Sequence, residues 1–133
     1  MSSITANSLS KTYGSVKAVD GIDLNVRSGQ VFGFLGPNGA GKSTTIKLLT
    51  TLIPPTSGQL SILGIDAVKK PLQVRNRIGV VLQQPSYEPT LSVEKSLDKY
   101  GMMWNIPQKI RKKRVEELLK EFNLKEIRHK KND

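Results

Sequence analysis

Residues 36–43 have the types and the spacing needed to hold a chain of phosphates. Their sequence, GPNGAGKS, fits the pattern G-x-x-x-x-G-K-[ST], the P-loop pattern. A triphosphate needs several backbone N–H groups around one concavity, and glycine permits the dihedral angles and close approach that this requires. The sequence therefore predicts a phosphate-binding loop made of Gly36, Pro37, Asn38, Gly39, Ala40, Gly41, Lys42, Ser43 and Thr44.

The end of the motif should carry most of the charge and metal chemistry. A helix that begins at about Gly41 adds free N–H groups and a positive dipole end. Lys42 can reach the β- and γ-phosphates, the Ser43 hydroxyl can ligate Mg²⁺, and Thr44 can add a phosphate contact. The plainer alternative is an ordinary glycine-rich turn between a strand and a helix. A dinucleotide site is disfavoured, because no G-x-G-x-x-G occurs.

Strands and helices must alternate around this loop to hold it. Residues 22–27 alternate apolar and polar side chains as a half-buried strand does, whereas Val31–Leu35 is apolar throughout, as in a central parallel strand. After Lys42 the apolar period becomes helical, until the prolines of IPPTSG, residues 53–58, end it. The further predicted strands are 4–9, 59–63 and 78–83, and the further predicted helices are 71–77, 92–105 and 107–122.

Composition limits the other possibilities. The 133 residues carry a net charge of +10 and no cysteine, which excludes disulfides and thiolate metal sites. A basic chain suits a polyphosphate, but also nucleic acid or an anionic membrane face. No apolar run approaches the ~20 residues of a membrane helix. We therefore expect a soluble chain that needs a partner to work at a membrane.

Three stretches together carry a family resemblance. They are LSKTYG, the run from AVDGIDL through the P-loop to LSILGID, and IGVVLQQPSYEPTLSVEKSL. From Ile4 to about Phe122 the chain resembles the ATP-binding subunit of an ABC transporter, most of all those of drug or antibiotic exporters. The resemblance implies an α/β P-loop NTPase fold of the ABC type, with an N-terminal antiparallel β portion and C-terminal helices. It also implies ATP and Mg²⁺ as ligands.

The resemblance implies roles for particular residues. Residues 36–44 match the Walker A loop, and Tyr13 matches the aromatic residue that stacks on adenine, although a strand-end tyrosine is the plainer reading. Gln83 matches the Q-loop glutamine near Mg²⁺ and the attacking water, with Gln84 as the alternative register. Gln83–Leu91 would contact a transmembrane permease subunit, unless this segment is a solvated loop. A second ATP-binding subunit and a peripheral position at the cytoplasmic face of the membrane are implied as well.

Other parts of the family pattern are missing. The sequence has no L-S-G-G-Q signature and no apolar strand that ends in Asp-Glu, and its one histidine, His129, lies in a basic tail. Lys42 and Gln83 would contribute to catalysis, but no complete catalytic set is present. We therefore expect residues 1–133 to be a truncated, N-terminal half of an ABC-type domain: the P-loop at 36–44, the Q-loop at about 83–91 and the start of a helical region at about 92–133. An exposed strand edge or apolar patch, with low stability or self-association, should follow.

Three functions remain open at this point. The first is an ATPase subunit whose ATP hydrolysis powers a membrane partner. The second, preferred for these residues alone, is a module that binds nucleotide without turning it over. The third is association with nucleic acid, motivated by Arg111–Arg114 and Arg128–Lys131. We do not expect it, because four consecutive basic residues spread around a helix instead of lining one face.

Overall fold

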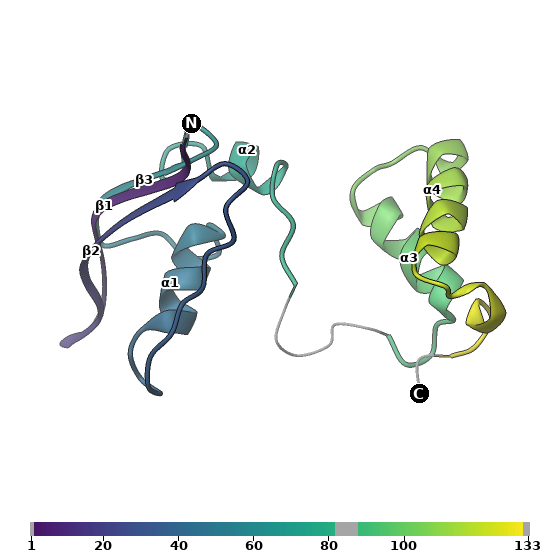
Figure 1. The fold of residues 1–133 in the computed structure, drawn as a ribbon, viewed down its shortest axis with the longest axis horizontal. Helices are drawn as coiled ribbons and strands as arrows, with labels where there is room; N and C mark the ends of the chain where they lie inside the picture. Colours follow the sequence, from purple (N-terminus) through teal and green to yellow (C-terminus); the bar gives the residue numbers. More distant parts are fainter. Residues whose placement is uncertain (1, 82–87, 132–133) are drawn as a thin grey trace. The chain divides into compact units, whose positions relative to one another are not determined.

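The computed structural model describes residues 2–81 and 88–131. The chain divides into two compact units, residues 1–81 and 82–133 (Figure 1). The first unit carries the sheet and the P-loop. The second is helical.

The first unit is built on a four-stranded antiparallel sheet. Strands β1 (Ser2–Tyr13) and β2 (Val16–Arg27) pair along their length. Strand β3 (Ser57–Ile62) pairs with the other edge of β1, and the short β4 (Ile65–Asp66) pairs with β3, so the order is β2-β1-β3-β4. The alternating pattern of residues 22–27 and the strand expected at 4–9 are confirmed within β2 and β1. The strand expected at 59–63 is confirmed as β3, except that β3 ends at Ile62.

One face of this sheet is buried against two helices. Helix α1 (Lys42–Leu49) follows the P-loop, and helix α2 (Pro71–Arg75) follows β4. Ala6 of β1 lies opposite Leu24 of β2 and Leu60 of β3, so that alternate residues face the core together. The buried core is formed by Ala6, Leu9, Val19, Leu48, Leu49, Leu60, Ile62, Ala67 and Val74.

The second unit is a pair of helices closed by a short 3₁₀ turn. Helix α3 (Val93–Met103) begins after Ser92, whose hydroxyl accepts a hydrogen bond from the Lys95 N–H at 3.4 Å. Helix α4 (Gln108–Glu121) buries Val115 and Leu119. Of the apolar face expected from the spacing of Val115, Leu118, Leu119 and Phe122, Leu118 is half-buried, and Phe122, just after the helix, is 63% exposed. The turn Lys125–Ile127 follows.

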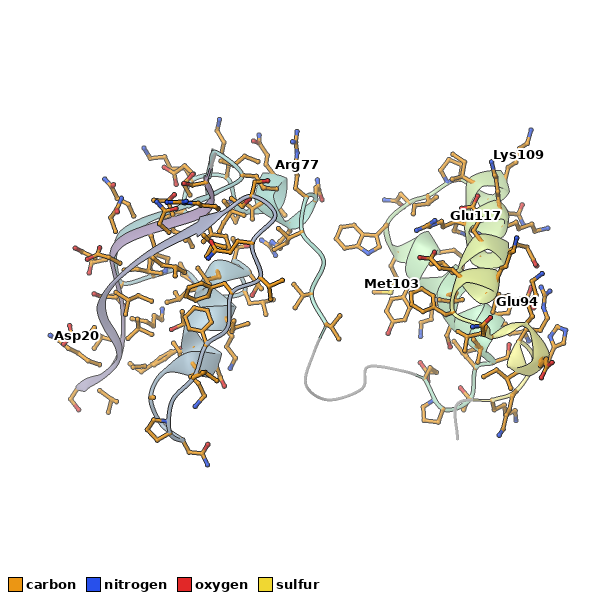
Figure 2. All side chains as sticks on the ribbon, in the orientation of Figure 1. Asp20, Arg77, Glu94, Met103, Lys109 and Glu117 are labelled. Atoms are coloured by element: carbon orange, nitrogen blue, oxygen red, sulfur yellow. The ribbon has the colours of Figure 1, made fainter. Side chains whose placement is uncertain are left out.

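Ion pairs tie this second unit together. Arg111 donates to Asp98 at 2.7 Å, which joins α4 to α3. Arg128, beyond the 3₁₀ turn, donates to Glu94 of α3 at 2.7 Å and to Glu116 of α4 at 2.6 Å. Figure 2 shows Glu94 among the side chains of this helical unit. The guanidinium of Arg128 therefore connects the last described segment to both helices.

Two strands predicted from sequence are not formed in the described residues. Val31–Leu35 has no strand pairing, and neither do residues 78–81, the described part of the strand expected at 78–83. Val31 is 98% exposed and Leu35 is 96% exposed, so this run is not a buried central strand. A central parallel strand needs hydrogen-bonded neighbours on both edges, and the described part of the chain offers none beside it. Phe34 still packs against the core.

Candidate functional site

The P-loop connects the open segment 28–35 to helix α1, and Gly41 makes the connection. Gly41 is the N-cap of α1 and has φ 82° and ψ 2°, a left-handed conformation that side chains with a Cβ disfavour. A Cβ built on Gly41 would overlap the carbonyl oxygen of Ala18 in β2. The loop is therefore held against the sheet by a backbone approach that only glycine permits.

The start of α1 presents unpaired donors. No acidic residue lies in its first turn, and no side chain caps it. Thr45 is buried, and both its N–H and its hydroxyl donate to the Gly41 carbonyl, at 2.8 and 3.0 Å. The first N–H groups of the helix thus stay directed out of its N-terminus, where an anion is favoured. This cradle fits a phosphate group.

Lys42 supplies the positive charge of the site. Its ammonium donates to the carbonyl oxygens of Gly36 at 2.5 Å and Pro37 at 2.6 Å, and so lies folded over the loop. Lys42 and Thr44 are half-buried, whereas Ser43 is exposed. Contact between the ammonium and a phosphate oxygen would replace its neutral carbonyl partners by a charged acceptor, which is the stronger kind of hydrogen bond.

Tyr13 lies at the same end of the sheet as the loop. It is the last residue of β1 and pairs with Val16, two residues before Ala18, the residue that contacts Gly41. Its side chain is 49% exposed, and the Lys11 ammonium stands 5.3 Å from the ring centroid. An exposed aromatic face on this side suits stacking on a base, and the adenine role of Tyr13 stays a prediction.

The predicted Q-loop residue cannot be joined to this geometry, because Gln83 and Gln84 lie outside the described residues. Of the segment expected to contact a permease, residues 88–91 are described. The Glu88 carboxylate accepts from the Lys99 ammonium at 2.8 Å, and this hydrogen bond lowers the pKa of Glu88. Within the described ranges, no group of three or more His, Cys, Asp or Glu residues could hold a metal ion. The Mg²⁺ roles of Ser43 and Gln83 stay predictions.

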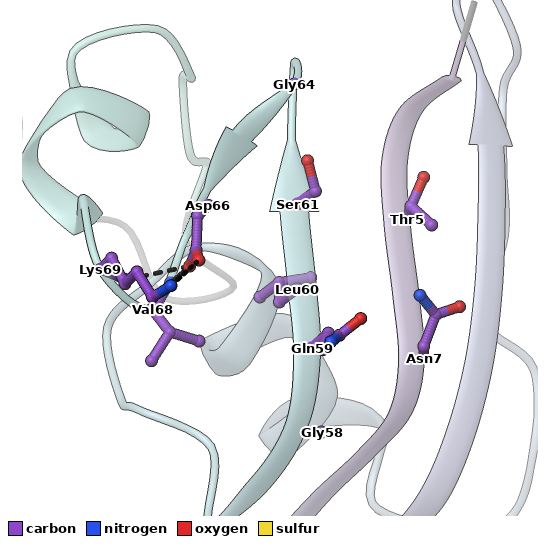
Figure 3. A pocket seen from close by; sticks show the side chains of 10 residues that line it. All are labelled: Thr5, Asn7, Gly58, Gln59, Leu60, Ser61, Gly64, Asp66, Val68 and Lys69. Carbon is purple, nitrogen blue, oxygen red and sulfur yellow. Dashed lines mark hydrogen bonds and ion pairs between the residues drawn. The ribbon is translucent and has the colours of Figure 1, made fainter.

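A second hollow lies away from the P-loop, on the solvent face of the sheet (Figure 3). It measures about 500 Å³ and is lined by paired polar residues, Thr5 opposite Ser61 and Asn7 opposite Gln59. At its edge the Asp66 carboxylate accepts from the backbone N–H groups of Val68 and Lys69, both at 3.0 Å. The hydrogen bond from the Lys69 N–H contributes most to lowering the pKa of Asp66, and the one from Val68 adds to it. The hollow lies over the outward-facing residues of these alternating strands, and no P-loop residue lines it.

Sequence reasoning missed three contributors to the P-loop region. Thr45 locks the first turn of α1 by two bonds to Gly41, Ala18 supplies the backbone against which Gly41 packs, and Lys11 stands over Tyr13. The Lys11 contact had a signal, since residues i and i+2 of a strand share one face. The Thr45 bonds are local as well, since they run from i to i−4 within the helix, as threonine hydroxyls often bond in helices. The Ala18 contact depends on tertiary structure that no local pattern carries.

Comparison with known proteins identifies this arrangement. Residues 19–133 match the sequence family described as "ABC transporter". The chain belongs to the ABC transporter family. The match confirms the resemblance drawn from the sequence and the ABC-type ATPase fold. No helix in the described part of this ABC family member is long and apolar enough to cross a membrane.

Relatives of this ABC chain include proteins named for drug and antibiotic resistance or transport. It is 42% identical over 123 residues to the doxorubicin resistance ATP-binding protein DrrA of Mycobacterium tuberculosis, covering 91% of this chain and 37% of DrrA. It is 44% identical over 94 residues to the bacitracin transport ATP-binding protein BcrA of Bacillus licheniformis, covering 71% of this chain and 31% of BcrA. The chain thus spans about a third of the length of these relatives.

Solved structures agree with the family. A dimeric ATP-binding cassette, MJ0796, in a post-hydrolysis state with ADP and Pi, has a TM-score of 0.78 and 26% identity, covering 97% of this chain and 61% of that one. The protein cbiO1 of Clostridium perfringens, part of the transporter complex cbiONQ, has a TM-score of 0.83 and 26% identity. The match covers 98% of this chain and 54% of cbiO1. The ABC fold thus extends over both units of the chain.

Proposed function

We propose that residues 36–44 bind the phosphates of ATP together with Mg²⁺, and that the complete protein uses ATP hydrolysis to power transport by a membrane partner. The observation that carries this proposal is the P-loop itself. Gly41 is held against Ala18, the N–H groups of α1 are open, and the Lys42 ammonium lies at the mouth of the loop. The names of the relatives support a drug or antibiotic as the transported compound.

Each site residue has a role in this proposal. Lys42 exchanges its carbonyl partners for β- and γ-phosphate oxygens, and the first N–H groups of α1 hold the same phosphates. Ser43 offers its hydroxyl as a metal ligand, and Tyr13 offers its ring face to adenine. When bound, Mg²⁺ neutralises charge on the phosphates during phosphoryl transfer. Gln83 would orient groups at the metal.

Turnover and coupling require parts beyond these residues. In the proposed assembly, a second ATP-binding subunit closes the nucleotide site and a permease contacts residues 83–91 at the cytoplasmic face of the membrane. We propose that residues 1–133 form the nucleotide-capturing part of the ABC domain and by themselves hold ATP without steady-state hydrolysis. The dimeric cassette with ADP and Pi supports this division, since it is a family member that assembles in pairs.

Association with nucleic acid finds no support in the basic residues that suggested it. Arg111 is paired with Asp98, Arg114 with Glu117, and Arg128 with both Glu94 and Glu116. Arginines engaged in this way are not available as a row of phosphate contacts. Arg111 and Arg128 join separate segments of the helical unit by these ion pairs, whereas the Arg114–Glu117 pair lies within α4.

Calorimetric titration of the chain with ATP, with and without Mg²⁺, tests the proposal. We expect saturable binding that Lys42→Ala weakens roughly tenfold to a hundredfold, since one charge-assisted contact is lost. Lys47→Ala is the matched control, because Lys47 is an exposed lysine in the last turn of the same helix. Tyr13→Ala should weaken binding without removing it. Equal affinities for the Lys42→Ala and Lys47→Ala variants would refute the proposed site.

A further inference from the structure

Lys11 lies on the same strand as Tyr13, the residue predicted to stack on adenine. Its ammonium stands over the Tyr13 ring, 5.3 Å from the ring centroid. A lysine cation within about 6 Å of the centroid is attracted to the electron-rich face of an aromatic ring. Tyr13 is still 49% exposed with the cation in place. The cation therefore occupies one face of the ring and leaves the opposite face for a ligand.

The Lys11 ammonium has a second contact that fixes its position. It donates a hydrogen bond to the Pro54 carbonyl oxygen at 2.7 Å. Two further bonds hold the same segments together. The Thr56 N–H donates to the Ser10 carbonyl at 2.9 Å, and the Thr12 N–H donates to the Thr56 hydroxyl at 3.1 Å. The ammonium thus lies between an aromatic ring and a carbonyl oxygen whose own segment is bonded to β1.

The segment that contains Pro54 continues directly from the P-loop helix α1. Just after the helix, the Leu52 N–H donates to the carbonyl of Lys47, in the last turn of α1, at 2.9 Å. Contacts therefore run from α1 through Pro54 and Lys11 to Tyr13. The same helix presents its N-terminus to the proposed phosphate site. Lys11 thus connects the helix proposed to hold the phosphates with the ring proposed to hold the base.

We propose that Lys11 is a positioning residue for the nucleotide base. Anchored on Pro54, its cation holds the Tyr13 ring in one orientation and leaves the opposite ring face to adenine. A ring that is already held loses less conformational freedom when a base stacks on it. The inference rests on the proposed binding of ATP and adds a residue that acts through Tyr13.

Calorimetric titrations of the whole chain with ATP and with tripolyphosphate, both with Mg²⁺, test this role. Tripolyphosphate carries three phosphates but no base, so its affinity does not depend on Tyr13. Lys11→Met keeps the aliphatic length and removes the cation. It should weaken ATP binding roughly twofold to fivefold and leave tripolyphosphate binding unchanged, which also shows that the P-loop unit is still folded. Lys11→Arg keeps a cation and should restore the ATP affinity.

Lys17→Met is the matched control. Lys17 is an exposed lysine of β2 opposite Thr12, and its ammonium pairs with Asp20 at 3.1 Å. Its substitution removes the same charge near the same end of the sheet. The ratio of ATP affinity to tripolyphosphate affinity should therefore stay at its native value in Lys17→Met and fall in Lys11→Met.

A double substitution separates this role from a general effect of charge. In the Tyr13→Ala background, Lys11→Met should have no further effect on the ratio, because the ring on which the cation acts is absent. An unchanged ratio in Lys11→Met, or an equal effect of Lys11→Met with and without the Tyr13 ring, would overturn the role of Lys11 alone. A native chain that binds neither ligand would overturn the proposed ATP function and this inference with it.

Discussion

The α-carbon of Gly41 lies so close to the Ala18 carbonyl that no side-chain carbon fits between them. This contact joins the N-cap of the P-loop helix to strand β2, across more than twenty residues of sequence. The position of the loop is therefore set by the antiparallel sheet as well as by the helix that follows. Two separate demands meet at Gly41, a left-handed φ of 82° and the absence of a Cβ.

Gly41→Ala should remove ATP binding and lower the stability of the first unit. The left-handed φ alone costs roughly 1–2 kcal/mol for a residue with a Cβ. The clash with backbone adds to this, because neither β2 nor α1 can move without disturbing the core. Thermal unfolding followed by circular dichroism, together with ATP calorimetry, measures both effects.

Gly64→Ala is the matched control for this prediction. Gly64 has a similar φ of 75°, but a Cβ there meets nothing within 4 Å. It should show the conformational penalty alone and keep ATP affinity unchanged. Equal destabilisation by the two substitutions would mean that the Ala18 contact is not rigid.

Ser43→Ala should abolish the part of ATP affinity that depends on Mg²⁺. Ser43 is exposed at the start of α1, where its hydroxyl is accessible to a metal, so its removal should leave folding intact. Calorimetry with and without Mg²⁺ should show a metal-dependent gain in the native chain and none in the variant. Ser43→Thr, which keeps a hydroxyl, should retain the gain. A metal effect that persists in Ser43→Ala would assign the Mg²⁺ contact to another residue.

Sequence patterns predicted those elements whose stability is local or periodic. The alternation in 22–27 describes one inward face, and Ile22, Leu24 and Val26 are partly or fully buried as expected. The helical spacing likewise predicts the burial of Val115 and Leu119, although Phe122, at the end of the same row, is exposed. The P-loop was predictable because its glycines are needed where the backbone takes dihedral angles, or makes close contacts, that a Cβ would prevent, and this need is visible in the local sequence. Such predictions need no knowledge of what lies beside the element.

The elements that were predicted wrongly depend on neighbours. Val31–Leu35 is apolar on both faces, a pattern that describes a strand paired on both sides, and no strand pairs with it in the described residues. The contacts of the Lys42 ammonium with the Gly36 and Pro37 carbonyl oxygens could not be predicted either, since they follow from the closed shape of the loop. A sequence pattern indicates which secondary structure a segment prefers. A strand forms only where a neighbouring strand is available to pair with it.

Glu94 should make the stability of the helical unit depend on pH. The hydrogen bond from Arg128 lowers the pKa of Glu94, with smaller contributions from the charges of Arg128 and His129, opposed by desolvation and Asp98. A lowered pKa in the folded state means that the carboxylate stabilises the fold above its unfolded pKa and loses this effect as pH falls through the folded pKa. Glu94→Gln should therefore lower the melting temperature at neutral pH. The difference should narrow as the pH falls below the unfolded pKa of glutamate, about 4.3, and close once the pH is below the lowered folded pKa.

The control for Glu94 is Glu126→Gln. Glu126 is exposed in the 3₁₀ turn and makes no ion pair with a described residue, so its substitution should change the melting temperature little at any pH. Melting curves across the acidic range compare the two variants. If the native chain and Glu94→Gln differ in melting temperature as much in acid as at neutral pH, the substitution destabilises the unit through lost packing and not through lost charge.

Leu119→Ala should unfold the helical unit without affecting ATP capture. Leu119 of α4 is fully buried, and truncating a buried leucine costs about 2–5 kcal/mol. Hydrogen exchange should show lost protection in residues 93–121, while ATP calorimetry keeps its native affinity because the P-loop belongs to the other unit. Leu118→Ala, at a half-buried position, is the milder control. Loss of ATP affinity in Leu119→Ala would show that the two units depend on each other.

The exposed run Val31–Leu35 should make the chain self-associate. Phe34 packs on the core and meets Phe32 edge to face at 5.2 Å between ring centroids, whereas Val31 and Leu35 are almost fully exposed. The run has unpaired backbone and apolar side chains, a combination that recruits other chains.

Sedimentation velocity over a range of protein concentrations measures this association. The double substitution Val31→Lys with Leu35→Lys should shift the population towards monomer, because it places like charges where two chains would meet. Val16→Lys is the control, since Val16 is also an exposed apolar residue, 64% accessible, but lies in a paired strand. If the native chain stays monomeric at every concentration, the exposed run Val31–Leu35 does not drive association between chains, and the prediction is wrong.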